Sequence, residues 1–322
     1  MGRKEEITFL SANKTTNVHA VKWIPEDGEY HAILQITHGM IEYIDRYDDF
    51  ASFLNEQGIL VVGHDHVGHG KSVNDQKDWG YMGTNHPDQV LVQDMHTLRN
   101  IIQSENKPLP YFMMAHSMGS YMLRKYITLY AQGLSGAIIM GTGYVAPIAV
   151  DAAFVVLNIL KTIYGDRHRS HLAQNILYSR PYRQFDLTGK DFSNSWLTKD
   201  QKKVEEYYSR PDCTFMFTLN GYQALLCAVK YDCRQKNINK IPKELPVAFF
   251  SGENDPVGNL GKGVTKVYRM FQKAGMKDVS CKLYKDDRHE ILNETDKDMV
   301  QQDIFKWMQK QIGTNAQTTP LK

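Results

Sequence analysis

Short apolar runs alternate with segments of helical periodicity along most of the chain, a pattern typical of a mainly parallel sheet covered by helices on both faces. The first two runs, at 7–11 and 17–25, predict an antiparallel strand pair. Six more strands are predicted at 32–39, 59–65, 110–116, 136–141, 246–252 and 279–284. Helices are predicted at 46–57, 88–103, 118–131, 264–274 and 297–311. The chain is therefore expected to form an α/β fold around an eight-stranded, mostly parallel sheet.

The alternation stops after Gly143 and resumes near residue 246. Between these points the sequence has helical character and no convincing strand. We therefore expect a core made of residues 1–145 and 242–312, split by a helical cap at 146–241. The polar residues 313–322 are expected to form a disordered tail.

The charge balance and the cysteines narrow the function classes. The 38 Lys and Arg residues nearly match the 36 Asp and Glu residues, and the formal net charge is +2. Such a chain has no strong field that would attract nucleic acid, so no nucleic-acid partner is expected. The four cysteines show no CxxC spacing, and we expect them to be free thiols in a reducing compartment.

Secretion and membrane insertion are not expected from the sequence. The N-terminal residues MGRKEEITFLSANKT contain no apolar h-region, which argues against a signal peptide. The most apolar window, 146–164, is interrupted by Asp151, Asn158 and Lys161. We interpret it as too short and too polar for a membrane-spanning helix. A cytoplasmic protein is the resulting expectation.

One serine has the setting of a nucleophile. Ser117 lies in the segment AHSMG, where a predicted strand runs directly into a predicted helix. A sharp turn at that junction exposes the hydroxyl, and the small residues Ala115 and Gly119 let the strand and the helix approach closely. The segment is an A-x-S-x-G form of the G-x-S-x-G nucleophile elbow. The alternative is an ordinary serine at a helix N-terminus, which is common for so short a motif.

Two residues farther along the chain favour the catalytic interpretation. In folds with such an elbow, an acid and then a histidine follow the serine, each after a later strand. Asp255 follows the predicted strand that ends at Gly252, and His289 follows the one that ends at Tyr284. We therefore predict Ser117 as nucleophile, His289 as general base and Asp255 as the acid that orients the histidine.

Three other carboxylates are rivals for the role of the acid. Asp286 and Asp287 also lie after the last strand, but they are so near His289 in sequence that contact with its Nδ1 needs a tight local turn. Glu253 is a weaker rival in the same loop as Asp255.

An oxyanion hole requires two backbone N–H groups. One is expected from Met118, the residue after the nucleophile, and the other from Met40, in the loop after the strand at 32–39. We attribute Gly39 to backbone angles that only glycine adopts freely and that turn an N–H inward. His38 is expected to brace this loop without transferring a proton.

The segment GHDHVGHGKS at 63–72 suggests two further sites. A phosphate-binding loop of the form G-x-x-x-x-G-K-S requires glycine at position 65, where this chain has Asp65. A metal site formed by His64, His66 and His69 with Asp65 would need ligands from elsewhere in the chain. We expect neither, and interpret the segment as a structural loop that Asp65 holds in place.

These motifs together resemble one family. The segments THGM (37–40), HDHVGHGKS (64–72), AHSMG (115–119), SGENDPVG (251–258) and KDDRHEI (285–291) resemble the monoacylglycerol lipase and lysophospholipase branch of the α/β-hydrolases. The resemblance covers about residues 8–311 and is weakest in the expected cap. It implies a serine esterase mechanism, no cofactor, and a helical cap over the site. The same branch is similar to some serine aminopeptidases, so amide substrates stay open.

The expected cap is rich in apolar and aromatic residues, which favours a lipophilic ester as substrate. Monoacylglycerol, lysophospholipid and small aryl esters are not separated by the sequence. We expect one apolar face of 146–164, including Phe154 and Leu157, to line the acyl entrance and to allow transient contact with a membrane surface. An amidase would instead need an acidic cap residue for the substrate amine, and its candidates are Asp151, Asp166, Glu205 and Glu206.

Overall fold

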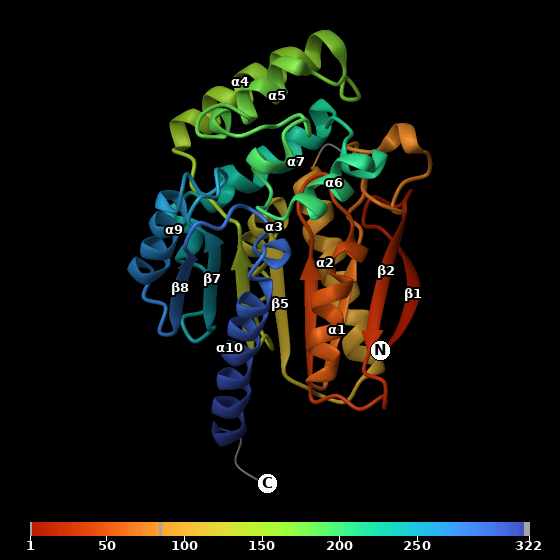
Figure 1. The fold of residues 1–322 in the computed structure, drawn as a ribbon, viewed down its shortest axis with the longest axis vertical. Coiled ribbons are helices and arrows are strands. Elements are labelled where there is room, and N and C mark those ends of the chain that lie inside the picture. Colours follow the sequence, from red (N-terminus) through yellow and green to blue (C-terminus); the bar gives the residue numbers. More distant parts are fainter. Residues whose placement is uncertain (1, 84–85, 319–322) are drawn as a thin grey trace.

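A computed structural model describes residues 2–83 and 86–318 of the chain. Its sheet has eight strands in the order β1-β2-β4-β3-β5-β6-β7-β8 (Figure 1). They are β1 (Arg3–Leu10), β2 (Asn17–Ile24), β3 (Ala32–Thr37), β4 (Ile59–His64), β5 (Tyr111–His116), β6 (Gly136–Met140), β7 (Val247–Gly252) and β8 (Val279–Tyr284). β1 pairs antiparallel with β2, and β2 antiparallel with β4, whereas all other neighbours are parallel. The predicted α/β fold is confirmed.

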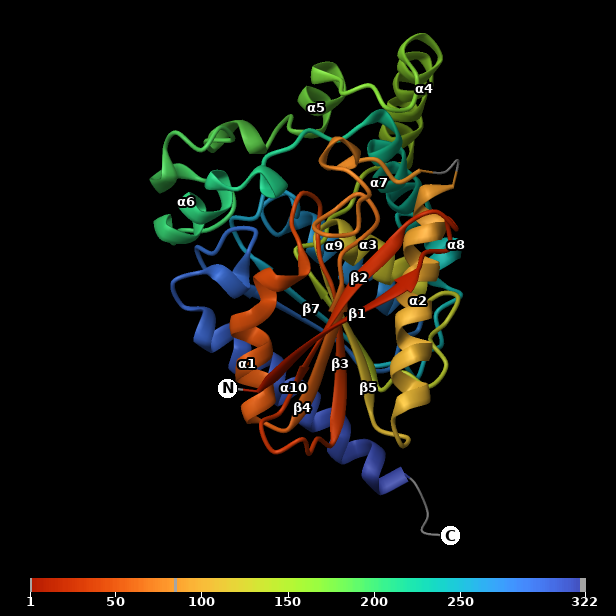
Figure 2. The ribbon, with the colours of Figure 1, turned by 90° about the vertical axis from the view of Figure 1, so that its right-hand side faces the viewer.

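The strands β3 to β7 consist only of buried residues, because helices cover both of their faces. The apolar residues of α2 (Pro87–Glu105), α3 (Met118–Tyr126) and α9 (Lys262–Lys273) pack in one hydrophobic cluster. Those of α1 (Asp48–Glu56) and α10 (Lys297–Thr318) pack in another. Figure 2 shows α1 and α2 on opposite sides of the sheet.

Five α-helices lie between β6 and β7 and form the region above the sheet in Figure 1. They are α4 (Pro147–Tyr164), α5 (His171–Leu177), α6 (Gln201–Ser209), α7 (Leu219–Asp232) and α8 (Gln235–Ile238). The one β-bridge described in this region joins Asp186 and Ser195. These helices occupy the range 146–241, and we call this range the cap.

Arg124 on α3 anchors the start of the cap and the end of α7 to the core. Its guanidinium donates to the carbonyl oxygen of Gly143, just before the cap, at 3.0 Å and to that of Asp232, at the end of α7, at 2.9 Å. The side chain is buried, so both hydrogen bonds are shielded from water. The position of the cap is therefore fixed by the same helix that follows Ser117.

Helix boundaries differ from the predictions at three places. A 3-10 turn at Ile44–Tyr47 precedes α1, so the helix begins later than residue 46. Helix α3 ends at Tyr126 instead of residue 131, where the hydroxyl of Thr128 donates to the carbonyl of Lys125 and competes with the helical pattern. Helix α10 continues to Thr318, into the tail predicted to be disordered from residue 313. Residues 319–322 lie outside the described part, and the prediction for them stands untested.

Candidate active site

The chain makes a sharp turn at Ser117, between the end of β5 and the start of α3. Its backbone angles are φ 51° and ψ −121°, a conformation that is strained for any residue other than glycine. A Cβ atom at Gly119 would lie 2.4 Å from the carbonyl oxygen of His38 and 2.6 Å from that of Thr37. Only glycine therefore lets α3 begin this close to β3, and the turn has the geometry of a nucleophile elbow.

His289 and Asp255 meet at the ends of β8 and β7. The Nδ1 atom of His289 lies 3.0 Å from the Oδ1 atom of Asp255, and both side chains are buried. The carboxylate is held from its own loop as well, because it accepts hydrogen bonds from the backbone N–H of Val257 at 2.8 Å and the hydroxyl of Ser251 at 3.3 Å. The acid is thus fixed in place independently of the histidine.

The rival carboxylates point elsewhere. Asp287 forms an ion pair with Lys199 at 2.6 Å, and burial raises its pKa to about 6. Asp286 and Glu253 are exposed. Among the four candidates, Asp255 is the one whose carboxylate has a described contact with the ring of His289.

Two aromatic rings enclose the ring of His289. The indole of Trp196 stacks on it with ring centroids 5.1 Å apart, and the imidazole of His116 lies 4.4 Å away. Trp196 comes from the cap, in a polar stretch between α5 and α6. A lone tryptophan carries no sequence signal of a contact so distant along the chain, so Trp196 was not among the predicted site residues.

Met40 and Met118, the predicted oxyanion donors, line the same cavity as Ser117. Met118 is the first residue of α3, a position whose N–H has no acceptor within the helix. The prediction that Gly39 adopts backbone angles open only to glycine was wrong, because its φ is not positive. The positive φ in this loop belongs to Ile41, at 59°. Gly39 is required by space, because a Cβ atom there would lie 2.8 Å from the Cβ of Ser117.

His38 braces the loops after β3 and β4. Its Nε2 accepts from the backbone N–H of His66 at 2.9 Å, so the proton is on Nδ1, which lies 2.8 Å from the carbonyl oxygen of Gly39. Burial, together with the charges of His66 and His69, lowers the pKa of His38 well below its ordinary value. The ring is therefore neutral and structural, as predicted.

Asp65 holds the histidine-rich loop in place, as expected. Its carboxylate accepts from the backbone N–H of Ile44 at 2.8 Å and of Lys71 at 2.9 Å, and lies 2.9 Å from Nδ1 of His19. A Cβ atom at Gly70 would collide with this carboxylate at 2.4 Å. Within the described ranges, no group of His, Cys, Asp or Glu has the arrangement of a metal site.

A cavity of about 510 Å³ extends from Ser117 into the cap. Its wall is formed mainly by apolar and aromatic residues of α4, α5 and α7, including Ala149, Ala153, Val156, Leu157, Leu160, Ile176, Leu177, Tyr222, Leu225 and Leu226. Among the residues that the structure describes, Arg180 is the one charged residue that lines it, and no carboxylate does. The cavity is therefore suited to an apolar chain that ends near the serine.

The expectation for Phe154 and Leu157 is half correct. Leu157 is buried and lines the cavity. Phe154 is not part of the wall and packs instead beneath the ammonium of Lys230, 4.9 Å from its ring centroid. The two residues are three positions apart on α4 and are therefore neighbours on the helix surface, but Leu157 is the one that reaches the cavity wall.

The outward face of α4 is also apolar. Ile148 is 81% exposed, Val155 60% and Ile163 63%. Among the described residues, α4 is the one helix whose length and composition would permit a membrane span, and 11% of it is buried. The prediction that this window is too short and too polar for a membrane span was therefore wrong on both length and composition. The helix has apolar residues on both sides because one side lines the cavity.

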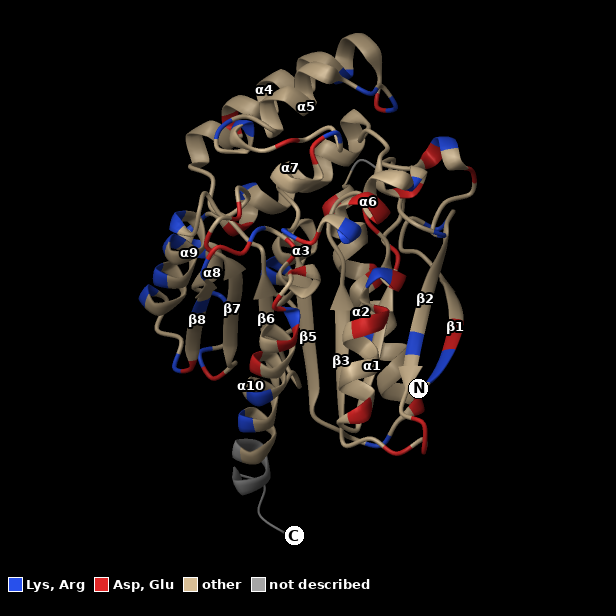
Figure 3. Ribbon diagram, in the orientation of Figure 1, with Lys and Arg blue, Asp and Glu red and all other residues tan. Residues whose placement is uncertain are grey.

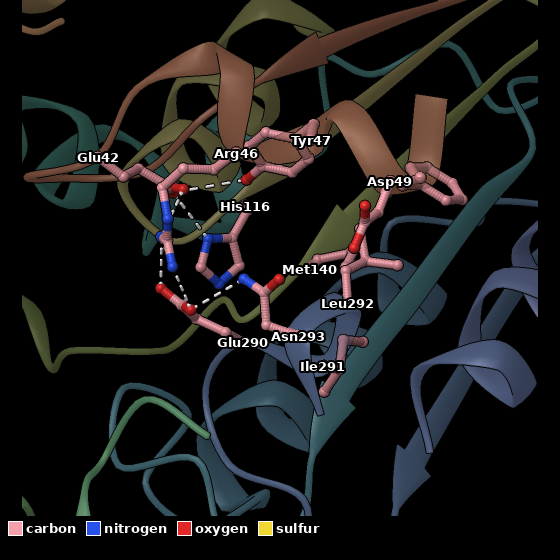
Figure 4. Close-up of a pocket in the computed structure, with 11 residues that line it drawn as sticks. Glu42, Arg46, Tyr47, Asp49, His116, Met140, Glu290, Ile291, Leu292 and Asn293 are labelled. Carbon is pink, nitrogen blue, oxygen red and sulfur yellow. Dashed lines mark hydrogen bonds and ion pairs between the residues drawn. The ribbon is translucent and has the colours of Figure 1, made fainter. Parts of the chain in front are cut away.

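A buried ion network lies beneath the site (Figure 4). The guanidinium of Arg46 binds both carboxylate oxygens of Glu290 at 2.7 Å and one oxygen of Glu42 at 3.2 Å. Glu42 accepts from the backbone N–H of Gly39 and lies 3.0 Å from Nδ1 of His116. The network therefore joins the loops that carry Met40, Ser117 and His289.

The charges in this network stabilise one another. Burial opposes ionisation of Glu290, but the nearby charge of Arg46 prevails and lowers the pKa of this carboxyl to about 2. Burial likewise disfavours a charged His116, but its hydrogen bond to Glu42 raises the imidazole pKa. The other ring nitrogen of His116 lies 3.1 Å from the carbonyl oxygen of His289, so both nitrogens have acceptors.

Comparison with known proteins finds a match to the family model described as serine aminopeptidase, S33, over residues 28–296. The chain is 35% identical over 97 residues to monoglyceride lipase of Rattus norvegicus, a match that spans 30% of that protein. It is 23% identical over 305 residues to monoacylglycerol lipase of Mycolicibacterium smegmatis, covering 95% of this chain and 97% of that protein. A thermostable carboxyl esterase from Bacillus coagulans superposes with a TM-score of 0.88 and 30% identity, covering 97% of this chain and 100% of that one.

Gly119→Ala should disrupt the elbow, because the added methyl group meets two backbone carbonyl oxygens that cannot move aside. We expect a loss of about 3 kcal/mol in the free energy of unfolding, measured by urea denaturation. Gly313→Ala is the matched control, since a Cβ atom there meets nothing within 4 Å. Equal stability of the two variants would contradict this account of Gly119.

Arg46→Gln should leave two buried carboxylates without their cation. We expect a loss of about 3–5 kcal/mol in the free energy of unfolding near neutral pH. The depressed pKa of Glu290 contributes stability that is present above about pH 4.5 and is lost as the pH falls toward about 2.

The variant should therefore lose less stability than the wild type over that acid range, as measured by denaturation at several pH values. Arg3→Gln breaks an exposed ion pair with Glu5. It should change neither the stability near neutral pH nor the loss of stability in the acid range. If the free energy of unfolding of Arg46→Gln fell as steeply as that of the wild type over this acid range, Arg46 would not be what holds Glu290 ionised.

Proposed function

This chain belongs to the α/β-hydrolase family described as serine aminopeptidase, S33, and we propose that it is a carboxylic ester hydrolase that uses Ser117, His289 and Asp255. The observation that carries the proposal is the apolar cavity that ends at Ser117. A monoacylglycerol lipase and a carboxyl esterase are among the proteins that match over nearly their full length, which supports the same class of reaction here.

In the proposed mechanism, His289 removes the proton of Ser117 as the serine oxygen attacks the ester carbonyl. The backbone N–H groups of Met40 and Met118 stabilise the resulting oxyanion. His289 then protonates the leaving alcohol as the acyl-enzyme forms. Water attacks the acyl-enzyme, gives its proton to His289, and the serine regains a proton as the acid departs. Asp255 orients the ring and stabilises the imidazolium.

The proposed substrate is a lipophilic ester with a single acyl chain, such as a monoacylglycerol or a lysophospholipid. The cavity wall offers apolar contacts along α4, α5 and α7, and burial of each methylene in such a wall contributes about 0.8 kcal/mol. A long acyl chain therefore gains affinity that a short one cannot. The small polar head would remain near Ser117 and Trp196, which line the same cavity.

An amidase or aminopeptidase using the same three residues is the alternative, and the description of the family keeps it open. A free substrate amine would need a carboxylate in the pocket, and within the described part of the chain none lines the cavity. Three of the four acidic candidates in the cap form ion pairs with lysines: Asp151 with Lys230, Asp166 with Lys161, and Glu206 with Lys203. Hydrolysis of aminoacyl anilides at the rate of esters would favour this alternative.

The cap is proposed to touch the membrane surface from which a lipophilic ester is taken. The outward residues Ile148, Val155 and Ile163 form an exposed apolar face on α4. The opposite side of the same helix forms the cavity wall, so an ester would have a short path between the two. We propose a cytoplasmic location, because the four cysteines are free thiols, which a reducing compartment preserves.

Substitution of the three residues should separate their roles. Ser117→Ala and His289→Ala should each lower kcat by about 10⁵-fold or more, and Asp255→Asn by about 10⁴-fold. Hydrolysis of a p-nitrophenyl ester gives kcat, labelling by a fluorophosphonate probe reports the serine, and the melting temperature reports folding. Asp287→Asn is the matched control and should retain most activity. If it proved as damaging as Asp255→Asn, the assignment of the acid would be wrong.

Two adjacent alanines on α4 test the acyl cavity. Ala153 lines the cavity, whereas Ala152 is exposed. Ala153→Trp should fill the cavity and lower kcat/KM for a ten-carbon acyl ester at least about tenfold relative to a two-carbon ester. Ala152→Trp should leave this ratio unchanged for soluble substrates. Similar effects of the two variants on the ratio would show that the acyl chain binds elsewhere.

A further inference from the structure

A second, open groove of about 530 Å³ lies at the base of the cap, between α8, α9 and the link from β6 to α4. Of the residues in the described ranges, five cationic side chains line it, and no carboxylate does. They are Arg234, Lys236, Lys266, Arg269 and Lys273. Figure 3 shows the corresponding blue segments gathered on α8 and α9, at one edge of the sheet. A chain with a formal net charge of +2 thus concentrates positive charge at one place.

Most of this charge has no counterion within the protein. Lys236, Arg269 and Lys273 form no ion pair with any residue in the described ranges. Lys266 lies over the ring of Tyr144, 5.7 Å from its centroid. Arg234 is 3.7 Å from Asp151, which already pairs with Lys230 at 2.7 Å.

The spacing of the cations on α9 increases their mutual repulsion. Lys266, Arg269 and Lys273 follow one another by three and four positions, so they share one face of the helix. Like charges at these spacings destabilise a helix. A bound anion would remove this repulsion, which makes the groove suited to a phosphate.

The walls of the groove are held together by contacts of their own. The side-chain amide of Gln235 on α8 donates to the carbonyl oxygen of Met270 on α9 at 2.9 Å. The backbone N–H of Val145 contacts the sulfur of Cys233 at 3.4 Å. A Cβ atom at Gly263 would lie 3.2 Å from the backbone nitrogen of Tyr144, so α9 abuts the link closely. The cations are thus presented by a fixed scaffold.

The groove adjoins the exposed apolar face of α4. Pro147 lines the groove, and the next residue, Ile148, is the most exposed large apolar residue of that helix. A soluble phosphate compound would have no use for the apolar neighbour, whereas a phospholipid surface offers phosphates and acyl chains side by side. We propose that this groove binds the phosphate groups of anionic phospholipids and so anchors the cap on a membrane.

This inference is independent of the catalytic assignment, because none of the five cations lies in the wall of the active-site cavity. Loss of lipid binding and loss of hydrolysis are therefore separate outcomes. The full chain is tested by sedimentation with phosphatidylcholine vesicles, with and without phosphatidylglycerol.

The test variant is Arg269→Gln/Lys273→Gln, and Lys236→Gln/Lys266→Gln is a second one on other positions of the groove. Lys107→Gln/Lys306→Gln is the control, since it removes the same charge from two exposed lysines outside the groove. Each groove variant should bind the anionic vesicles roughly 10- to 30-fold more weakly than the wild type. The control should stay within about threefold of the wild type, because screening limits the effect of distant charges.

Binding to neutral vesicles and hydrolysis of a two-carbon ester should be unchanged in the groove variants. Equal weakening in the groove and control variants would overturn the proposal, because general electrostatic attraction would then suffice. It would also fall if inorganic phosphate raised the melting temperature of the wild type but not of the groove variants, while all of them bound vesicles alike. The occupant would then be a soluble phosphate.

Discussion

The guanidinium of Arg46, enclosed by the carboxylates of Glu42 and Glu290, is the interaction on which the geometry of the site depends. Glu42 fixes the N–H of Gly39 and the ring of His116, and Glu290 is bonded directly to His289 in sequence. Three loops far apart in the chain are thereby held by one cluster, in which Arg46 and His116 contact the two carboxylates. Charges removed from water are tolerated only when each is matched in this way, so the cluster has few alternative arrangements.

The strained turn at Ser117 is maintained by this surrounding order. A positive φ at a serine costs roughly 1–3 kcal/mol and persists only where neighbouring contacts over-determine it. The close approach of Gly119 to β3 and of Gly39 to Ser117 leaves the turn no room to relax. Backbone strain at the nucleophile and buried charge beneath it are therefore two parts of one rigid support.

The cap extends this support outward, with α4 as the element that separates two environments. Its inner side closes the acyl cavity and its outer side is exposed, so both sides are apolar for different reasons. Arg124 ties the start of the cap and the end of α7 to α3, which places the cavity wall at a fixed distance from Ser117. On the proposed path, a lipid moves from a membrane at the outer side of α4 to Ser117 in the cavity at its inner side.

The sequence by itself determined the strands, their alternation with helices, and the candidate residues Ser117, Asp255 and His289. Hydrophobic periodicity and the chain order of the motifs are local properties, and they persist whatever the rest of the chain does. Only the tertiary structure decided which carboxylate meets His289, which side of α4 carries Leu157, and that Trp196 and Arg46 belong to the site. These contacts join residues distant in sequence. Their partners are selected by packing and by the pairing of buried charge, neither of which leaves a periodic trace along the chain.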